Sequence, residues 1–368
     1  MRVIDEQATS ARRKALHFQG KQGDTKTNPP PTVMKLIKVA VTLAVVALFG
    51  STQQLMAAGD KPVKVGAAVY GLKAEFMQLW SNYLKAHPSV KSGQVKVTVF
   101  DGKYDPNTQN DQFDTMITQH FDAIIFVPID AEAGAAAVQK AHDAKIPVIG
   151  SNTRVKSDLL NSYIGSDDVV GGQLEAEAVI NKIGGKGNVV VIQGPIGQSA
   201  QIDRLQGNEE VLKKHPEVKV LESKTANWSR AEALSLMENW LTAHPNQIQG
   251  VIGQNDEMAL GALEAIRAAK LDVKKFAIAG IDGVTDAMIA AKAGEMVSFL
   301  QDAKAQAQGG LDLALRAIKG DSYQPQSDIW KQYEKDMPWN GGTDKHYKVP
   351  WTPITTENVD ALLKERQQ

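Results

Sequence analysis

Polar and aromatic side chains stand at or just beyond the ends of most short apolar runs in this sequence. They are Tyr70, Asp101, Asn152-Thr153-Arg154, Gln193, Trp228, Gln254-Asn255-Asp256, Asp282 and Gln301. A sugar hydroxyl both donates and accepts hydrogen bonds, so amide, carboxylate and guanidinium groups can each hold neighbouring hydroxyls. Aromatic faces cover the C–H patches of a sugar ring. This set of residues favours a binding site for a small polyhydroxylated molecule.

The motifs that catalysis or cofactor binding would need are missing from the sequence. No G-x-G-x-x-G follows an apolar run, and no G-x-x-x-x-G-K-[ST] occurs. No H-E-x-x-H or similar cluster suggests a zinc site. Ser199 does not lie in the nucleophile motif G-x-S-x-G. The adjacent acids Asp167 and Asp168 are typical of a solvated turn. We therefore expect no enzymatic activity, no catalytic residues, no metal and no cofactor.

Ten short runs rich in β-branched residues alternate with amphipathic stretches from Val63 onward. The predicted strands span residues 63–69, 95–100, 123–127, 147–151, 163–165, 188–193, 218–222, 250–253, 276–281 and 297–300. Continuously apolar strands that are separated by helices indicate parallel sheets covered on both faces. The predicted fold class is α/β, with doubly wound parallel sheets flanked by helices.

Two series of about five β–α units predict two similar lobes joined by a multi-strand hinge. We expect the first lobe to comprise residues 60–162 and 302–328, and the second to comprise 163–301 and 329–368. The tail from 328 to 349 is expected to be an irregular segment of strand and loop that returns across the hinge before a last helix at 358–364. Ligands of doubly wound sheets bind beyond the carboxyl ends of the strands, so the polar residues named above should gather there.

The first sixty residues predict export. Residues 1–33 are polar and without amphipathic period, and we interpret them as an unstructured upstream extension. From Met34 a short basic region precedes an apolar run and then Ala57 and Ala58, which is the pattern of a signal peptide over 34–58. The apolar run is shorter than the roughly 20 residues that span a membrane. We expect cleavage near Ala58 and a periplasmic protein, with either Met1 or Met34 as the start.

Composition supports a folded chain of more than one lobe. The sequence has 368 residues, of which 43% are hydrophobic and 23% charged, and this balance excludes global disorder and a coiled coil. The net charge of −1 offers no basic excess for nucleic-acid binding. The absence of cysteine excludes disulfides and a thiol nucleophile. No feature marks an oligomer, and we expect a monomer.

Several segments resemble the periplasmic sugar-binding proteins of the ribose/galactose type. The stretch 254–262, Gln-Asn-Asp-Glu-Met-Ala-Leu-Gly-Ala, is similar to that family's signature, and 280–283, Gly-Ile-Asp-Gly, is similar to its Gly-Phe-Asp-Gly. The resemblance covers essentially 63–320. It implies the type I periplasmic binding protein fold, hinge closure over a monosaccharide or polyol, and delivery to the membrane permease of an ABC importer. Service to a chemoreceptor or two-component sensor is the alternative that it leaves open.

The resemblance also implies roles for individual residues. Asn255 and Asp282 match hydroxyl-binding positions of the C-terminal lobe, Arg204 matches a ligand-binding arginine, and Gln301 matches a hinge-side glutamine. Trp228 stands where relatives place a stacking aromatic, and Phe76 lies in the corresponding region of the other lobe.

The sequence departs from the family at one corner of the expected site. The family's Asp-Arg pair after the fourth strand is replaced by Asn152-Thr153-Arg154, which moves the arginine by one position. The first loop carries Tyr70 where relatives often have asparagine or aspartate. The usual pyranose contact at this corner is therefore in question, and a different pentose or hexose, a cyclitol or a sugar alcohol becomes a candidate ligand.

Each candidate residue also has a purely structural interpretation. Asn255 is suited to cap the helix that follows it, and Asp282 before Gly283 is typical of a turn. Phe76 lies on the core-facing stripe of its helix, and Trp228 is suited to anchor a surface loop. Arg204 and Arg154 are each able to pair with a surface acid. The same architecture is compatible with two other functions. A sugar-responsive repressor would need an N-terminal helix-turn-helix segment, and an exported enzyme would need a catalytic motif; the sequence contains neither.

Overall fold

The computed structural model describes residues 61–366. The predicted upstream extension and signal peptide, 1–33 and 34–58, lie outside the described residues. Within 61–366 no helix has both the length and the apolar character needed to cross a membrane.

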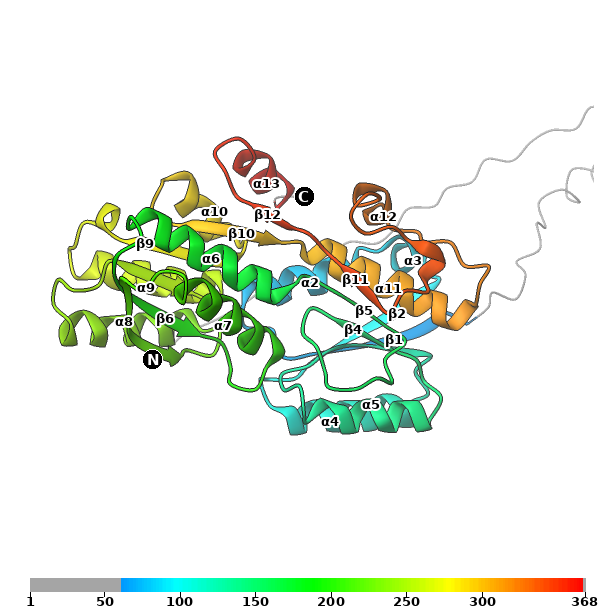
Figure 1. The fold of residues 1–368 in the computed structure, drawn as a ribbon. Helices are drawn as coiled ribbons and strands as arrows, with labels where there is room; N and C mark the ends of the chain where they lie inside the picture. Colours follow the sequence, from blue (N-terminus) through cyan, green and yellow to red (C-terminus); the bar gives the residue numbers. More distant parts are fainter. Residues whose placement is uncertain (1–60, 367–368) are drawn as a thin grey trace, which may run out of the picture. The chain divides into compact units, whose positions relative to one another are not determined.

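The first of two six-stranded sheets forms the centre of one lobe (Figure 1). Its strands lie in the order β11-β5-β4-β3-β1-β2 and all pair in parallel. Their bounds are β1 Val63–Val69, β2 Val95–Asp101, β3 Ala123–Val127, β4 Val148–Ser151, β5 Ser162–Gly165 and β11 His346–Lys348. The central strand β3 has the sequence Ala-Ile-Ile-Phe-Val and is buried throughout, as an apolar strand covered on both faces must be.

The second sheet repeats this design with the order β12-β10-β9-β8-β6-β7. The bounds are β6 Gly187–Gln193, β7 Val218–Thr225, β8 Gly250–Gly253, β9 Ala277–Asp282, β10 Val297–Gln301 and β12 Trp351–Pro353. The edge strand β12 pairs antiparallel with β10, and the other pairs are parallel. We call the parts built on the two sheets the first lobe and the second lobe.

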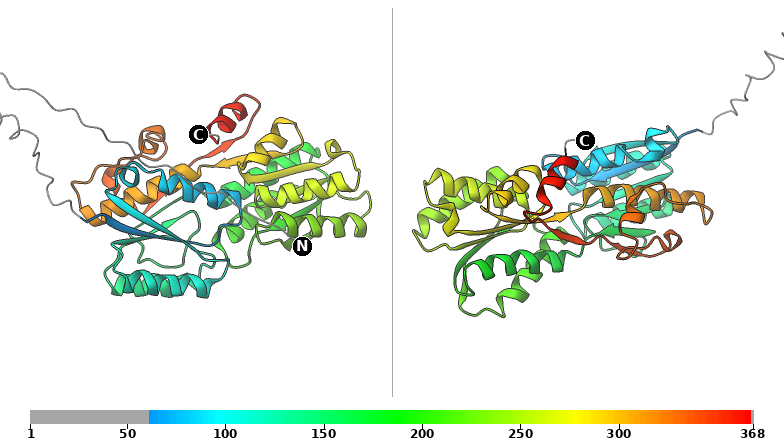
Figure 2. Two further views of the ribbon diagram at one scale, coloured as in Figure 1. Left: turned by 180° about the vertical axis from the view of Figure 1, so that it is seen from behind. Right: turned by 90° about the horizontal axis from the view of Figure 1, so that it is seen from above.

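Helices cover both faces of each sheet (Figure 2). Those of the first lobe are α2 Glu75–Lys85, α3 Pro88–Lys91, α4 Pro106–Thr118, α5 Gly134–Asp143, α11 Ala303–Lys319 and α12 Ile329–Gln332. Those of the second lobe are α6 Asp168–Lys182, α7 Ser199–Leu212, α8 Arg230–Ala243, α9 Asp256–Ala268, α10 Thr285–Lys292 and α13 Val359–Glu365. Two short 3-10 turns are η1 Val273–Lys275 and η2 Asn340–Gly342. In the first lobe α4 packs with α5 on one face and α2 packs with α11 on the other.

The chain passes between the sheets three times, after β5, after β10 and between β11 and β12. The two similar α/β lobes that the sequence predicts are confirmed, and the type I periplasmic binding protein architecture is the one observed. Two boundaries differ. Residues 163–165, expected in the second lobe, belong to the first, because they complete β5, which pairs with β4. Residues 329–348, also expected in the second lobe, belong to the first, because β11 pairs with β5. Trp330 and Tyr347 explain this placement, since their rings pack edge to face near α11 and both are buried.

Candidate ligand-binding site

A small cavity lies between the lobes, at the carboxyl ends of the strands of both sheets. Its walls are polar or aromatic with one exception, and they are made by Tyr70, Phe76, Asn152, Thr153, Gln198, Ala200, Arg204, Trp228, Asn255, Asp282 and Gln301. The strand ends and the resemblance together name nine residues for ligand binding, and eight of them lie together at the edge that the doubly wound topology predicts: Tyr70, Phe76, Asn152, Arg204, Trp228, Asn255, Asp282 and Gln301. The ninth, Arg154, does not line the cavity, and neither do the strand-end residues Asp101 and Gln193. The cavity volume is about 10 Å³, which admits roughly one water molecule.

Asn255 both caps a helix and faces the cavity. Its Oδ1 accepts a hydrogen bond from the amide of Met258 at 2.9 Å, which satisfies one of the first-turn amides of α9. Among residues 61–366 no side chain or backbone group pairs with its side-chain NH₂, which is therefore available to a molecule in the cavity. The capping and the ligand-binding interpretations of this residue are thus compatible.

Asp282 ends β9 with a positive φ of 132°, a conformation that few residues adopt without support from their surroundings. The support comes from Asp256, whose Oδ2 accepts hydrogen bonds from the amides of Gly283 and Val284 at 2.7 and 3.0 Å and from the hydroxyl of Ser298 at 2.8 Å. Burial raises the pKa of Asp282 well above its usual range, while the charge of Arg204 opposes that shift. Asp256 therefore fixes the loop that presents the Asp282 carboxyl group to the cavity.

Arg204 is held beneath the cavity by a buried ion pair. Its Nε donates to Asp168 Oδ1 at 2.9 Å, and both side chains are less than 5% exposed. A second guanidinium nitrogen donates to the carbonyl of Gln254. Burial alone lowers the pKa of Arg204, but the carboxylates of Asp168, Asp282 and Glu175 outweigh it and raise the pKa, so the guanidinium stays charged.

Two tryptophans flank the same guanidinium. Its carbon lies 5.5 Å from the ring centre of Trp228 and 5.8 Å from that of Trp351 in β12. Trp228 is buried, and its Nε1 donates to Gln198 Oε1 at 2.6 Å. Its ring also occupies the space that a Cβ at residue 194 would need, which explains Gly194.

The corner at which the sequence departs from its relatives is built from two amides. Asn152 Nδ2 donates to Gln301 Oε1 at 3.0 Å, and both residues are buried. The NH₂ group of Gln301 is buried without a partner among the described residues. Because a buried donor without an acceptor is costly, this group is suited to a ligand oxygen.

The first lobe contributes aromatic walls. Phe76 belongs to both the core and the cavity lining, so a packing role and a ligand contact are compatible for this residue. Tyr70 packs against Tyr104 with ring centres 5.6 Å apart, and burial raises its pKa well above the usual range. Arg154 lies outside the cavity: its guanidinium pairs with Asp203 of α7 and its amide donates to Ser199 at 2.7 Å, so it links the lobes.

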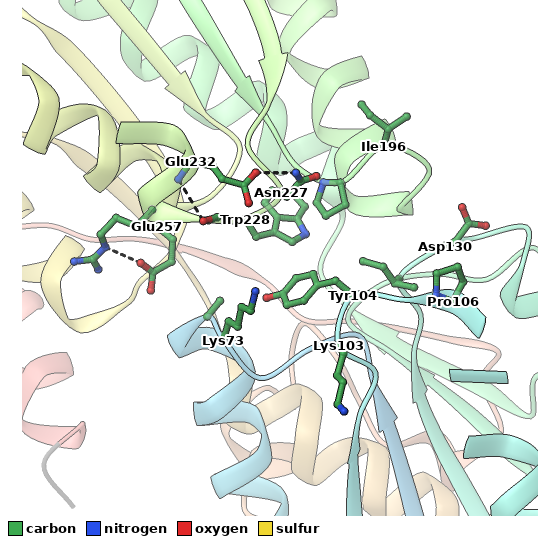
Figure 3. A pocket seen from close by; sticks show the side chains of 15 residues that line it. Lys73, Lys103, Tyr104, Pro106, Asp130, Ile196, Asn227, Trp228, Glu232 and Glu257 are labelled. Carbon is green, nitrogen blue, oxygen red and sulfur yellow. Dashed lines mark hydrogen bonds and ion pairs between the residues drawn. The ribbon is translucent and has the colours of Figure 1, made fainter. Parts of the chain in front are cut away.

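A wider groove of about 740 Å³ opens next to the cavity and shares Trp228 with it (Figure 3). Tyr104 of the first lobe and Trp228 of the second face this groove. Both residues have positive φ, and so do Lys103 and Asn227, which directly precede them. Strained non-glycine residues of this kind cluster at functional sites.

Gln198, Ala200 and Asp168 were not singled out from the sequence for the site, and Thr153 and Asp256 were put forward only as members of strand-end stretches. Thr153 and Gln198 line the cavity and each hydrogen-bonds the carbonyl of Pro128, while Ala200 is apolar. Asp168 and Asp256 support the site from behind. A carboxylate at the start of an apolar helix was a usable signal for both, but their partners depend on packing between segments far apart in sequence.

Comparisons with known proteins agree with this architecture. A family model described as "Periplasmic binding protein domain" matches residues 65–322. The xylitol-binding protein of Mycolicibacterium smegmatis is 34% identical over 85% of this chain and 84% of its own length. The ribose import binding protein of Salmonella typhimurium is 33% identical over 62% of this chain and 76% of its own length.

Among solved structures, a solute-binding protein of an ABC transporter from Bacillus halodurans, with bound myo-inositol, has a TM-score of 0.72 and 28% identity. The match covers 83% of this chain and 99% of that one. Such proteins bind solutes and do not transform them. The chain belongs to the periplasmic binding protein family, as a sugar- or polyol-binding component of the ribose/galactose type.

Proposed function

We propose that this chain captures an uncharged polyol or monosaccharide in the periplasm by closing its two lobes, and then delivers it to the permease of an ABC importer. The observation that carries the proposal is the cavity itself, because both lobes supply its lining and nearly all of that lining is amide, charged or aromatic. Such groups hold hydroxyls in pairs and cover C–H faces.

The electrostatics of the site favour an uncharged ligand. Arg204 is already neutralised by Asp168, so a ligand carboxylate or phosphate would find no free cation there. The amide pair of Asn152 and Gln301 is uncharged as well. Similarity to a xylitol-binding protein and to a structure that holds myo-inositol supports the same class. We propose a sugar alcohol or cyclitol as the preferred ligand.

Burial of the lining supports capture by lobe movement. Asn255, Asp282, Arg204 and Gln301 are each exposed by 5% or less, so a ligand reaches them only when the lobes separate. The three chain crossings between the sheets are the only covalent links between the lobes in residues 61–366, and they form the hinge of the proposed motion. The signal peptide expected at 34–58 supports a periplasmic location.

The test is calorimetric titration of the purified protein with xylitol, myo-inositol and ribose, together with thermal unfolding. A ligand at a hundred times its dissociation constant should add about 2.7 kcal/mol of stability. Asp282→Asn keeps the size of the side chain but replaces one carboxyl oxygen with an NH₂ group, and we expect affinity to fall roughly 10- to 100-fold, because a ligand hydroxyl enclosed in the cavity loses a hydrogen-bond partner. Asn255→Ser keeps an acceptor for the helix cap but removes the NH₂ group, and we expect a loss of roughly 3- to 10-fold.

The matched control is Asn181→Ala, at an exposed position near the end of α6, which should leave affinity unchanged. Wild-type affinity in both site variants would refute the assignment of the site. Failure of every uncharged polyol and monosaccharide to bind would refute the proposed function.

A further inference from the structure

Helices α2 and α10 begin without a capping side chain of their own. Ala74 precedes α2 and Val284 precedes α10, and neither side chain can accept a hydrogen bond from the first-turn amides. By contrast, α4, α6, α8, α9 and α11 begin after Asp, Ser or Asn side chains that do accept one. First-turn amides have no partner within their helix, so they need one from elsewhere.

That partner comes from the opposite lobe. Glu75, the first residue of α2 in the first lobe, accepts hydrogen bonds at its Oε1 from the amide of Thr285 at 3.0 Å and from the hydroxyl of Thr285. Thr285 is the first residue of α10 in the second lobe. In the reverse direction, Glu257 of α9 approaches the amide of Glu75, with its Oε1 3.5 Å from that nitrogen. We call the contacts among Glu75, Thr285 and Glu257 the cross-lobe cap.

An arginine of the second lobe pairs with carboxylates in and beside the cross-lobe cap. Arg230 Nε donates to Glu257 Oε2 at 2.7 Å, and Arg230 Nη1 donates to Asp286 Oδ2 at 2.8 Å. Its charge offsets the repulsion between carboxylates that the cross-lobe cap brings together, and the positive ends of two helix dipoles act in the same sense.

The cross-lobe cap borders the ligand site on both sides. Glu75 is followed by Phe76, which lines the cavity, and Thr285 comes three residues after Asp282, which lines it from the other lobe. Glu75 itself does not line the cavity. The contact exists only when the lobes are together, so it adds stability to the closed arrangement alone.

We propose that Glu75 is a positioning residue that raises ligand affinity by capping α10 across the cleft, without touching the ligand. The inference rests on the proposed function. A contact made only in the closed arrangement shifts the equilibrium between open and closed lobes, and the apparent affinity follows the closed fraction. Glu75→Ala should therefore weaken polyol binding about tenfold, equivalent to about 1.4 kcal/mol, through faster dissociation.

The experiment uses two spin labels, one on each lobe, in a sequence that has no native cysteine. Ala136→Cys on α5 and Ser235→Cys on α8 are exposed positions for them. Distances between the labels are measured in the wild-type background and in Glu75→Ala, with and without xylitol or myo-inositol, and affinity is measured by titration. Glu75→Gln retains an oxygen acceptor and should restore part of the wild-type behaviour. The control Asp105→Ala removes a cap that lies within the first lobe, so it should lower thermal stability and leave both distance and affinity unchanged.

The predicted result is that Glu75→Ala moves the label distances in the ligand-free protein toward longer values. Label distances that do not respond to Glu75→Ala would overturn the inference, and so would a response of equal size in Asp105→Ala. If no polyol binds to the wild type, the proposed function fails, and the ligand-free distances still decide the role of Glu75.

Discussion

At the scale of single residues, Asp256 shows how a group behind the site controls a group within it. One carboxylate oxygen accepts three hydrogen bonds that fix residues 283, 284 and 298, while the other, Oδ1, is buried without a partner among the described residues. Burial raises the pKa of Asp256 to about 7. The carboxylate is thus essential for the geometry of the Asp282 loop and unfavourable for stability when it is charged.

This pKa has a direct consequence for stability. An aspartate in the unfolded chain has a pKa near 3.9, so between about pH 4 and pH 7 the folded state holds the proton of Asp256 more tightly than the unfolded state does. The free energy of unfolding should therefore fall as the pH rises through this window. The side chain that Asp256→Asn introduces cannot titrate. The free energy of unfolding of this variant should therefore fall less over the same pH window than that of the wild type, by a few kcal/mol. Denaturant titrations from pH 4 to pH 8 measure the difference.

The comparison between the two proteins isolates one group, because Asp282 and the other buried acids contribute equally to both. An asparagine oxygen can still accept from the amides of Gly283 and Val284, so the fold should persist. Parallel pH profiles of the two proteins would contradict the assignment of a raised pKa to Asp256.

Which site residues can be predicted from the sequence depends on what positions them. Asn152, Asn255, Asp282 and Gln301 are found from the sequence because they end or follow strands, and parallel topology brings strand ends together. Asp168 is misjudged as solvated, because its burial depends on where Arg204 of another helix comes to lie. Contacts between helices are set by tertiary packing, which local pattern does not encode.

At the scale of elements, the crossing of α6 and α7 places Arg204. A Cβ at Gly172 of α6 would come within 2.1 Å of the carbonyl oxygen of Arg204, and a Cβ at Gly207 of α7 would come equally close to the carbonyl oxygen of Val169. Glycine is unfavourable within a helix, so these two positions are explained by the close approach of the helix backbones. The approach brings Asp168, at the start of α6, to the guanidinium.

Glycine-to-alanine substitutions test this crossing. Gly172→Ala should destabilise the protein by about 1–3 kcal/mol, despite its gain in helix propensity, and should also weaken ligand binding, because the helices must separate and Arg204 must move with α7. The matched variant is Gly310→Ala in α11, where the nearest atom to a new Cβ lies at 3.6 Å. It should stabilise by about 0.5–1 kcal/mol with unchanged affinity. Equal effects of the two substitutions on stability and affinity would refute the role given to the crossing.

The elements themselves were largely predictable. The ten predicted strands agree with β1 to β10 to within one residue except for β7, which extends three residues further. Buried parallel strands have strong apolar patterns, which explains this agreement. The strand β11 was expected only somewhere within the irregular segment 328–349, because its three residues carry no pattern of their own. Its position depends on the packing of Trp330 and Tyr347 beside α11.

At the scale of the whole molecule, two lobes of similar design present their strand ends to each other, and the chain crosses between them three times. Ligand-facing groups from both lobes, the Arg154–Asp203 ion pair and the cross-lobe cap all lie along this one boundary. Binding and lobe closure are therefore a single coupled event in our account. A ligand stabilises the closed arrangement by satisfying polar groups, such as the NH₂ of Gln301, that closure alone leaves without partners.

A crystal structure of the protein grown with the tightest-binding polyol shows directly whether binding and closure of the lobes are coupled. We predict an unmodified polyol enclosed between the lobes, with hydroxyl oxygens within hydrogen-bonding distance of Asn255, Asp282 and the NH₂ of Gln301, and with a carbon face against Trp228 or Phe76. A polyol bound only in the outer groove beside Tyr104, or one chemically altered in the crystal, would contradict this prediction.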